Sequence, residues 1–229
     1  EHTVAYADLR SVDKYMTVRL NQVIQEIREN GYEKYNFMHI YRTVMNFLTV
    51  DLSSFYLDFA KDVVYIEAEN DYQRRCMQTV FYQTLVSLTK LLTPIIPHTA
   101  EEIWSFLQEE EEYVQLAEFP GYETFTNEEE LMDTWAAFMD FRDNVLKALE
   151  AKVTVYPNEQ IRQLMTAVDA DIAQLLIVSD FEVSKEVAPS EAVQFEDMAI
   201  LVEKAEGETC DRCRSVRQDV GSDEKLPTL

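Results

Sequence analysis

The sequence predicts a mainly α-helical protein, in which a helical bundle is followed by a small α+β domain. Apolar residues recur at intervals of three and four through the first 150 residues, which is the period of an amphipathic helix. After residue 151 they alternate with polar residues, as in a β-strand. We therefore expect a bundle at residues 1–150, an α+β junction domain at 151–207 and a tail at 208–229.

The first three expected helices follow one another closely. The first ends before Gly31, which suits the left-handed position after a helix. The second covers residues 36–49, and either Asp51 or Ser53 can cap a third. Val63–Ile66 is a β-favouring run in which we expect a bend between helices. The residues expected to face inward from the second helix are Phe37, Ile40, Tyr41, Val44, Phe47 and Leu48.

A long helix and a proline corner come next. The helix begins near Asp71 and ends near Leu92, with its apolar stripe continuous along its length. Pro94 and Pro97 stop it, because proline has no backbone N–H to donate within a helix.

The helix after the corner is expected to begin with a capping box. Thr99 and Glu102 have the required spacing, and Ile103 and Phe106 are expected on the buried side. An acidic loop follows, and Asn127 is then expected to cap a last bundle helix at 128–150.

The α+β part is predicted to contain one helix, at Glu159–Val168, among short strands. The expected strands are Lys152–Tyr156, Leu175–Val178 and Ala199–Glu203. The step from the last bundle helix to the first strand contains no turn residue. We therefore expect that residues are missing between positions 150 and 151.

The formal net charge of −23 argues against nucleic-acid binding by the chain as a whole, because phosphate favours a basic surface. The charge is uneven, however. Residues 1–90 hold 10 Lys and Arg against 12 Asp and Glu, whereas residues 91–229 hold 10 against 31. Only the first segment is close to neutral, so a basic face is expected there. The acidic remainder is interpreted mainly as a solubilising surface.

The cysteine content and the length of the apolar runs predict the compartment of the protein and its relation to membranes. Three cysteines do not form a disulfide framework, which favours a reducing, cytoplasmic location. No apolar run reaches the ~18 residues of a membrane span, and the first residues do not resemble a secretion signal.

Several sequence blocks, in order, resemble one protein family. Residues 94–104 read P-I-I-P-H-T-A-E-E-I-W, and residues 46–62 contain V-D-L-S-S-F-Y-L-D-F-A-K-D. Arg74-Arg75 heads the long helix, Asp133-Thr-Trp135 begins a further block, and residues 201–207 precede a C-x-x-C. Together they resemble the anticodon-binding helical domain and C-terminal region of class I aminoacyl-tRNA synthetases, and most closely bacterial isoleucyl-tRNA synthetases.

The resemblance implies a protein that holds the anticodon stem and loop of an isoleucine-accepting tRNA, most simply as a monomer. The parent enzyme would be an isoleucine–tRNA ligase. The signatures that such enzymes use to bind ATP and Mg²⁺ are not present, so this segment alone is expected to be catalytically inactive.

Five cations in the helical part are candidate tRNA contacts, and each has an intramolecular alternative: Arg42, Lys61, Arg74, Arg75 and Arg142. Arg42 and Arg142 lie on apolar stripes, where a buried ion pair is the favoured interpretation. Lys61 is expected at a helix end, with an intramolecular Lys–Asp or capping role slightly favoured over a tRNA contact. Arg74 and Arg75 open a helix, where either phosphate or Asp71 would stabilise them.

Exposed aromatic residues can stack on unpaired bases. Most aromatic residues here lie on apolar stripes, so core packing is the better interpretation for them. Tyr32, Tyr35 and Tyr113 lie near predicted loops and are expected to be exposed.

The tail contains Cys210 and Cys213, which supply half of a tetrahedral zinc site. The resemblance implies a second C-x-x-C that this chain does not contain. A redox pair is the alternative, disfavoured because no helix begins behind it. Arg212, Arg214 and Arg217 form a basic cluster that is a further candidate for RNA contact, with an exposed flexible tail as the equal alternative.

Two other functions remain open at this point. One is a segment of a related valyl or leucyl enzyme. The other is a non-catalytic helical module that binds a protein, which would show a large exposed apolar face and no affinity for tRNA.

Overall fold

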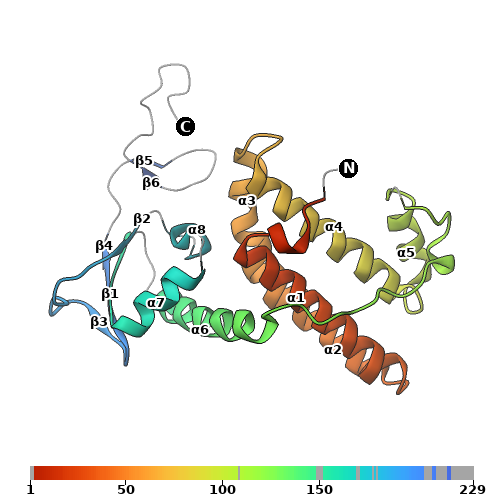
Figure 1. The fold of residues 1–229 in the computed structure, drawn as a ribbon, viewed down its shortest axis with the longest axis horizontal. Coiled ribbons are helices and arrows are strands. Elements are labelled where there is room, and N and C mark those ends of the chain that lie inside the picture. Colours follow the sequence, from red (N-terminus) through yellow and green to blue (C-terminus); the bar gives the residue numbers. More distant parts are fainter. Residues whose placement is uncertain are drawn as a thin grey trace. The chain divides into compact units, whose positions relative to one another are not determined.

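The computed structural model describes residues 3–107, 109–147, 152–168, 171–176, 178, 180–203, 208–209 and 216–217. The chain forms two compact units, residues 1–128 and residues 129–229. Among the described residues, the first unit contains helices and turns, and the second contains helices and a sheet (Figure 1). The predicted fold class is confirmed. No described helix combines the length and the apolar character that crossing a bilayer requires.

The first unit begins with a short 3-10 turn, Tyr6–Asp8, and α1, Ser11–Glu26. A π-helical turn, Ile27–Tyr32, then leads toward α2.

A single helical run follows from residue 37 to residue 66. It consists of α2 (Phe37–Asn46), π-helical residues Phe47–Tyr56 and α3 (Leu57–Ile66). The predicted cap at Asp51 or Ser53 and the predicted bend at residues 63–66 are therefore wrong. Asp51 is buried within the run and accepts two hydrogen bonds from Arg19, at 3.2 and 3.0 Å, so it stabilises helix packing and not a helix start.

The long helix is confirmed as α4, Tyr72–Leu92, and the proline corner leads to α5, Pro97–Trp104. The predicted capping box of Thr99 and Glu102 is wrong. The helix begins at Pro97, whose missing N–H is harmless at a first helical position, so Thr99 already lies inside the first turn. Phe106 is exposed, because the helix ends two residues before it. A 3-10 turn at Val114–Leu116 precedes the segment that leads to the second unit.

The core of the first unit lies between α1, α4 and the helical run 37–66. The largest fully buried side chains here are Met16, Ile27, Ile40, Phe47, Tyr56, Phe59, Met77 and Leu91. Two residues predicted to face inward, Phe37 and Tyr41, are instead 53% and 60% exposed. The helix turns only Ile40, Val44 and Phe47 toward the core, which is a narrower stripe than the apolar content suggests.

Gly31 serves close packing and not helix termination. It lies inside the π-helical turn, and a Cβ atom added to it would meet Ile40 Cγ1 at 2.4 Å. The turn after α1 therefore needs glycine because α2 passes so close to it.

The second unit contains α6 (Glu128–Lys147), α7 (Glu159–Val168) and α8 (Ile172–Leu176) beside a mixed sheet. Its strands are β1 (Lys152–Pro157), β2 (Asp180–Val183), β3 (Val193–Gln194) and β4 (Met198–Glu203), in the order β2-β1-β4-β3. β1 pairs in parallel with β2 and antiparallel with β4, and β3 pairs antiparallel with β4. A separate hairpin joins β5 (Glu208–Thr209) and β6 (Val216–Arg217).

Most of the predicted elements of this unit are confirmed, with one exception. Residues 175–178, predicted as a strand, contain the end of α8, and the strand parallel to β1 begins at Asp180. A parallel pair requires a crossover, and α7 and α8 supply it here.

The helix α6 packs within the second unit. The Phe141 and Phe181 rings meet edge to face with centroids 6.5 Å apart, and Arg142 Nε donates to the Leu175 carbonyl oxygen at 3.2 Å. The compact units thus divide near residue 128, whereas the sequence grouped this helix with the bundle. The functional domain boundaries at residues 150 and 207 stay a prediction.

Candidate nucleic-acid interface

Three of the predicted cations lie on the two helices that meet at the α3–α4 corner: Lys61 on α3, and Arg74 and Arg75 in the first turn of α4. Asp71 forms the N-cap of α4, and its Oδ1 accepts the backbone N–H groups of Gln73 at 2.8 Å and Arg74 at 3.2 Å. These bonds satisfy amides that every helix start leaves free. The whole of α4 contains no acidic residue.

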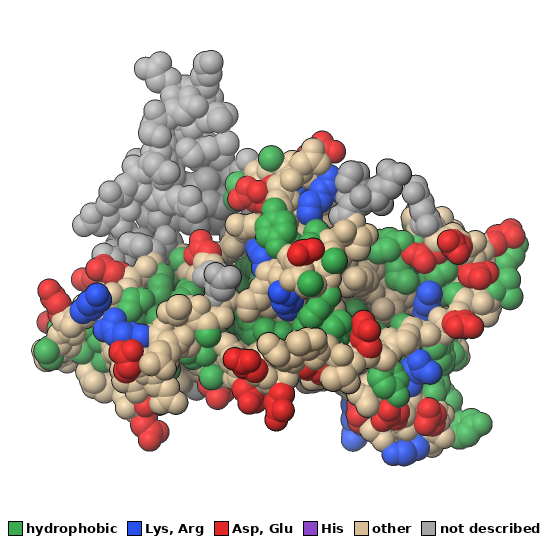
Figure 2. All heavy atoms as spheres, viewed as in Figure 1, with side chains coloured by type: hydrophobic (Ala, Val, Ile, Leu, Met, Phe, Trp, Pro, Cys, Tyr) green, Lys and Arg blue, Asp and Glu red, His purple; other side chains and the backbone are tan. Residues whose placement is uncertain are grey.

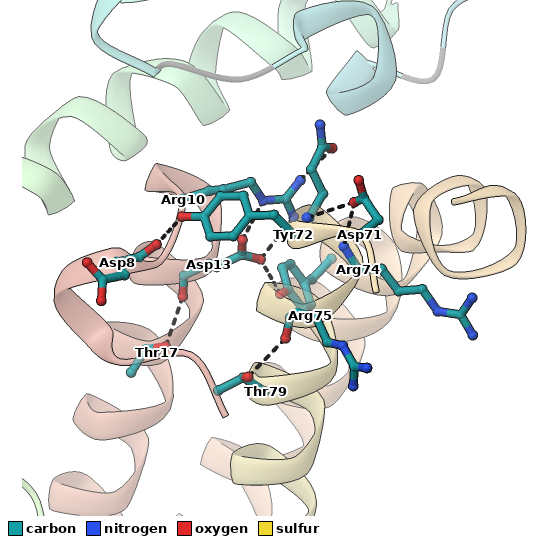
Figure 3. A network of polar contacts seen from close by, with 11 residues as sticks. Asp8, Arg10, Asp13, Thr17, Asp71, Tyr72, Arg74, Arg75 and Thr79 are labelled. Atoms are coloured by element: carbon teal, nitrogen blue, oxygen red, sulfur yellow. Dashed lines mark hydrogen bonds and ion pairs between the residues drawn. The ribbon is translucent and has the colours of Figure 1, made fainter. Parts of the chain in front are cut away.

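Arg74 and Arg75 fix the corner loop with part of their hydrogen-bonding capacity. Arg74 Nη1 donates to the Glu67 carbonyl oxygen at 3.0 Å, and Arg75 Nη2 donates to Asn70 Oδ1 at 2.5 Å. The predicted side-chain pairing with Asp71 is therefore not the one formed, because that carboxylate is occupied by backbone amides. Figure 3 shows both guanidinium groups pointing away from the buried contacts of α1. A guanidinium has five N–H donors, so each retains donors for an anion.

Lys61 lies in the middle of α3 and not at a helix end. Its Nζ is 2.8 Å from Asp58 Oδ1, which confirms the predicted Lys–Asp pair, and the lysine side chain is 64% exposed. Such exposed pairs contribute roughly 0–1 kcal/mol, so the ammonium can exchange Asp58 for a phosphate at little cost. Tyr65, one helical turn further along, is 73% exposed.

A buried polar network holds the corner against α1. Asp13 is fully buried, and it accepts hydrogen bonds from Arg10 Nε at 2.6 Å and from the Tyr56 hydroxyl at 2.5 Å. Arg10 Nη1 continues to Gln73 Oε1 at 2.9 Å, in the first turn of α4, and the Tyr72 hydroxyl donates to the Asp8 carbonyl oxygen (Figure 3). Burial, followed by the nearby Asp13 carboxylate, raises the pKa of Tyr56 well above its usual value.

Sequence reasoning missed this network. The spacing of Arg10 and Asp13 at the start of α1 was a usable signal, since residues three apart meet on a helix. The contribution of Tyr56 had no local signal, because it lies 43 positions away in the sequence.

Acidic residues of the first unit lie both at the corner, where Asp58, Glu67, Glu69 and Asp71 are close in sequence to the cations, and in the loop after α5. Four consecutive glutamates, residues 109–112, follow α5, which is joined to the far end of α4. The 21 residues of α4 span about 30 Å, several times the Debye length of about 8 Å at physiological salt. The repulsion that this acidic loop exerts on an anion at the corner is therefore largely screened.

The other candidate residues are not part of this corner. Arg42 is exposed on α2, so the predicted buried ion pair is wrong. Arg142 is 8% exposed, and its Nε donates to the Leu175 carbonyl oxygen, while the predicted pairing with a carboxylate stays a prediction. The predicted exposure is confirmed for Tyr35 and Tyr113. It is wrong for half-buried Tyr32, whose hydroxyl donates to the Leu91 carbonyl oxygen at 2.6 Å.

The predicted tail site lies mostly outside the described residues. This holds for Cys210, Cys213, Arg212 and Arg214, and Arg217 is described only as a backbone position in β6. Within the described part of the chain, no group of three or more His, Cys, Asp or Glu residues is arranged to hold a metal ion. The zinc site stays a prediction.

Comparison with known proteins identifies the family. Residues 13–164 match the anticodon-binding domain of tRNA ligase. The chain belongs to this family. The match includes most of α1 and all of α2–α4, and therefore Lys61, Arg74 and Arg75.

Individual relatives of this anticodon-binding domain are named isoleucine–tRNA ligases. One from Enterococcus faecalis is 95% identical over 242 residues, covering 100% of this chain and 26% of the relative. One from Streptococcus sanguinis is 57% identical over 230 residues, covering 94% of this chain and 25% of the relative. The chain thus spans about a quarter of the length of these relatives.

The first alignment is longer than the chain, at 242 residues against 229, so it contains positions that this chain lacks. That agrees with the expectation of missing residues. Their predicted place, between residues 150 and 151, lies outside the described residues.

Proposed function

We propose that this chain binds the anticodon arm of an isoleucine-accepting tRNA, as one part of an isoleucine–tRNA ligase. The observation that carries the proposal is the family match over residues 13–164, together with relatives at 95% and 57% identity that bear this name. The relatives are about four times as long as this chain. On this proposal aminoacylation, with its ATP and Mg²⁺, belongs to the rest of the polypeptide, and this segment alone is inactive.

The corner of Lys61, Arg74 and Arg75 is the proposed contact with the tRNA backbone. Phosphate contacts fix the position of a nucleic acid on a protein, whereas base contacts carry sequence information. Arginine presents a planar fork that matches phosphate oxygens, and the two arginines here are already anchored on the loop 67–70. An anchored side chain loses less conformational entropy when it binds.

The second proposed component is the tail. Cys210 and Cys213 would contribute two thiolates to a zinc ion, with the remaining ligands supplied from outside this chain. Arg212, Arg214 and Arg217 would add positive charge beside it. We propose a monomer that acts in the cytoplasm, as expected for a protein of translation.

The proposal is tested by titrating the chain with isoleucine tRNA and with a non-cognate tRNA of equal length, at fixed salt. We expect tighter binding of the cognate tRNA, lost when its anticodon is changed. Equal affinity for both tRNAs would contradict anticodon recognition by this chain.

Two matched variants, at opposite ends of α4, test where the tRNA backbone contacts this helix. Arg75→Gln removes a charge at the corner, and Lys90→Gln removes one near the other end of the same helix, where Lys90 lies over the Trp104 ring. We expect Arg75→Gln to weaken binding and to reduce the salt slope by about one, and Lys90→Gln to change neither. Equal effects of the two variants would place the contact elsewhere.

A further inference from the structure

One face of α2 exposes large apolar side chains to solvent. Met38, Tyr41 and Met45 lie three and four residues apart, so they share a face, and they are 60%, 60% and 40% exposed. Tyr35, in the turn before α2, is 82% exposed. Helices ordinarily turn such side chains toward a core. In α2 the core-facing positions are already occupied by Ile40 and Val44, so this second stripe packs against no core.

The same segment is free of negative charge. The chain contains 43 acidic residues, yet no Asp or Glu occurs from Lys34 to Val50. Arg42 lies next to Tyr41 on the exposed face and has no hydrogen bond or ion pair with the described residues. His39 is held by Glu26, with Nε2 and Oε1 2.7 Å apart. The face is therefore apolar, aromatic and weakly basic.

Tyr35 is kept in solvent by an unusual backbone conformation. Its φ is 53°, in the left-handed region that bulky residues rarely adopt. Two backbone bonds close the turn around it, from Tyr35 N to Tyr32 O at 3.1 Å and from Asn36 N to Gly31 O at 2.8 Å. The Asn36 side chain then caps α2 by accepting from His39 N at 3.1 Å. A disfavoured conformation of this kind is retained where the surrounding structure imposes it, and it is enriched at ligand-binding sites.

We propose that this α2 face, formed by Tyr35, Met38, Tyr41, Arg42 and Met45, stacks on unpaired bases of the anticodon loop. The inference rests on the proposed function, and it adds the surface that receives the bases. Unpaired bases stack on tyrosine rings and on guanidinium planes, and flexible methionine side chains adapt to the gaps between them. The absence of carboxylates from this segment avoids repulsion of the neighbouring phosphates.

The α2 face and the α3–α4 corner contact different parts of one tRNA. Met38 and Lys61 are separated by about 35 Å along the continuous helical run. The corner, with its anchored cations, receives backbone phosphates, and the α2 face receives bases. The two contacts predict different variant phenotypes.

The experiment uses the complete chain and an isoleucine tRNA transcript with 2-aminopurine at one anticodon position, because stacking on an aromatic ring quenches its fluorescence. Tyr41→Ala and Tyr35→Asn each remove one ring, and Asn tolerates the left-handed backbone at position 35. We expect each variant to bind about tenfold more weakly and to lose the quenching. Tyr41→Phe keeps the ring and should behave as the original chain.

Arg42→Gln gives a second readout. Because Arg42 is proposed to stack on a base and not to contact a phosphate, this variant should weaken binding and leave the salt slope unchanged, as Tyr41→Ala does. Phe106→Ala is the matched control, because this ring is 83% exposed outside the α2 face. Circular dichroism verifies that every variant is folded.

The outcomes separate the two proposals. If Arg75→Gln weakens binding while Tyr41→Ala and Tyr35→Asn stay within twofold of Phe106→Ala, the α2 inference is wrong and the proposed function stands. In that case the face serves a protein contact. If the original chain does not bind the tRNA even at low salt, the proposed function fails, and the α2 inference fails with it.

Discussion

At the scale of single residues, Asp13 is a fully buried charged group in the first unit. It joins Arg10 to Tyr56, which lies next to the start of α3. A buried charge without its partner is costly, because the low-dielectric interior replaces the solvation by water.

We predict that Asp13→Asn destabilises the chain by about 3–5 kcal/mol, because the fully buried position 13 loses its charge and the largely buried Arg10, 16% exposed, loses its counter-charge. The free energy of unfolding from urea titrations measures this loss. The control is Asp58→Asn, which removes the exposed partner of Lys61 and should change stability by about 0.5 kcal/mol or less. A comparable loss in both variants would contradict the special role of Asp13.

Tyr15 gives stability a pH dependence at the alkaline end. Burial, followed by the Asp51 carboxylate, raises the pKa of Tyr15 from 10.0 to about 12. Below pH 10 both the folded and the unfolded chain hold this proton. Between pH 10 and pH 12 only the unfolded chain loses it, so unfolding is favoured as the pH rises.

We therefore predict that, between pH 8 and pH 11.5, ionisation of Tyr15 lowers the free energy of unfolding by about 2 kcal/mol. Tyr15→Phe should reduce the total pH-dependent loss by that amount. An unchanged pH profile in Tyr15→Phe would show that the phenol is not protected in the folded state.

At the scale of elements, the turn between α1 and α2 is limited by space. Gly31→Ala would place a methyl group 2.4 Å from Ile40 Cγ1, whereas a Cβ at Gly121 meets nothing within 4 Å. We predict that Gly31→Ala lowers the free energy of unfolding by about 1–3 kcal/mol through overpacking. Gly121→Ala should be neutral or slightly stabilising. Thermal unfolding of the two variants side by side tests this, and a neutral Gly31→Ala would mean that α2 can move away.

A residue of α6, Arg142, allows a prediction about the stability of the second unit. Arg142 is buried and donates to the end of α8, so it is a structural residue there. We predict that Arg142→Ala lowers the stability of this unit by about 2 kcal/mol and leaves tRNA affinity unchanged. Hydrogen exchange of α8 amides, together with tRNA titration, separates these effects. Weaker tRNA binding with unchanged protection would favour the RNA-contact interpretation.

At the scale of the whole molecule, the net charge of −23 does not describe how positive and negative side chains are distributed over the surface. On the face in view in Figure 2, Lys and Arg side chains lie among acidic ones and not in one continuous basic surface. Binding through three cations at one corner predicts a shallow salt dependence, with a slope of about −2.7 in logarithmic units. We expect the affinity for tRNA to fall about 40-fold between 50 and 200 mM salt. A slope steeper than about −6 would require a second basic surface, with the cluster in the tail as the first candidate.

The sequence alone determined the fold class, the long helices and the family. Amphipathic periodicity and proline placement act within a few residues, so α1, α4 and the corner at residues 94–97 follow from local pattern. The ordered blocks from residue 46 to residue 207 indicated the family that the comparison then showed.

Only the tertiary structure decided which charged and aromatic side chains are available to a ligand. Arg42 and Arg142 both lie on apolar stripes in the sequence, yet one is exposed and the other is buried against α8. The sequence predicted that Gly31 ends a helix, but glycine is required there because a Cβ atom would collide with Ile40. The physical reason is the same in each case. Exposure depends on which distant elements pack against a helix, and such contacts have no signature within the helix itself.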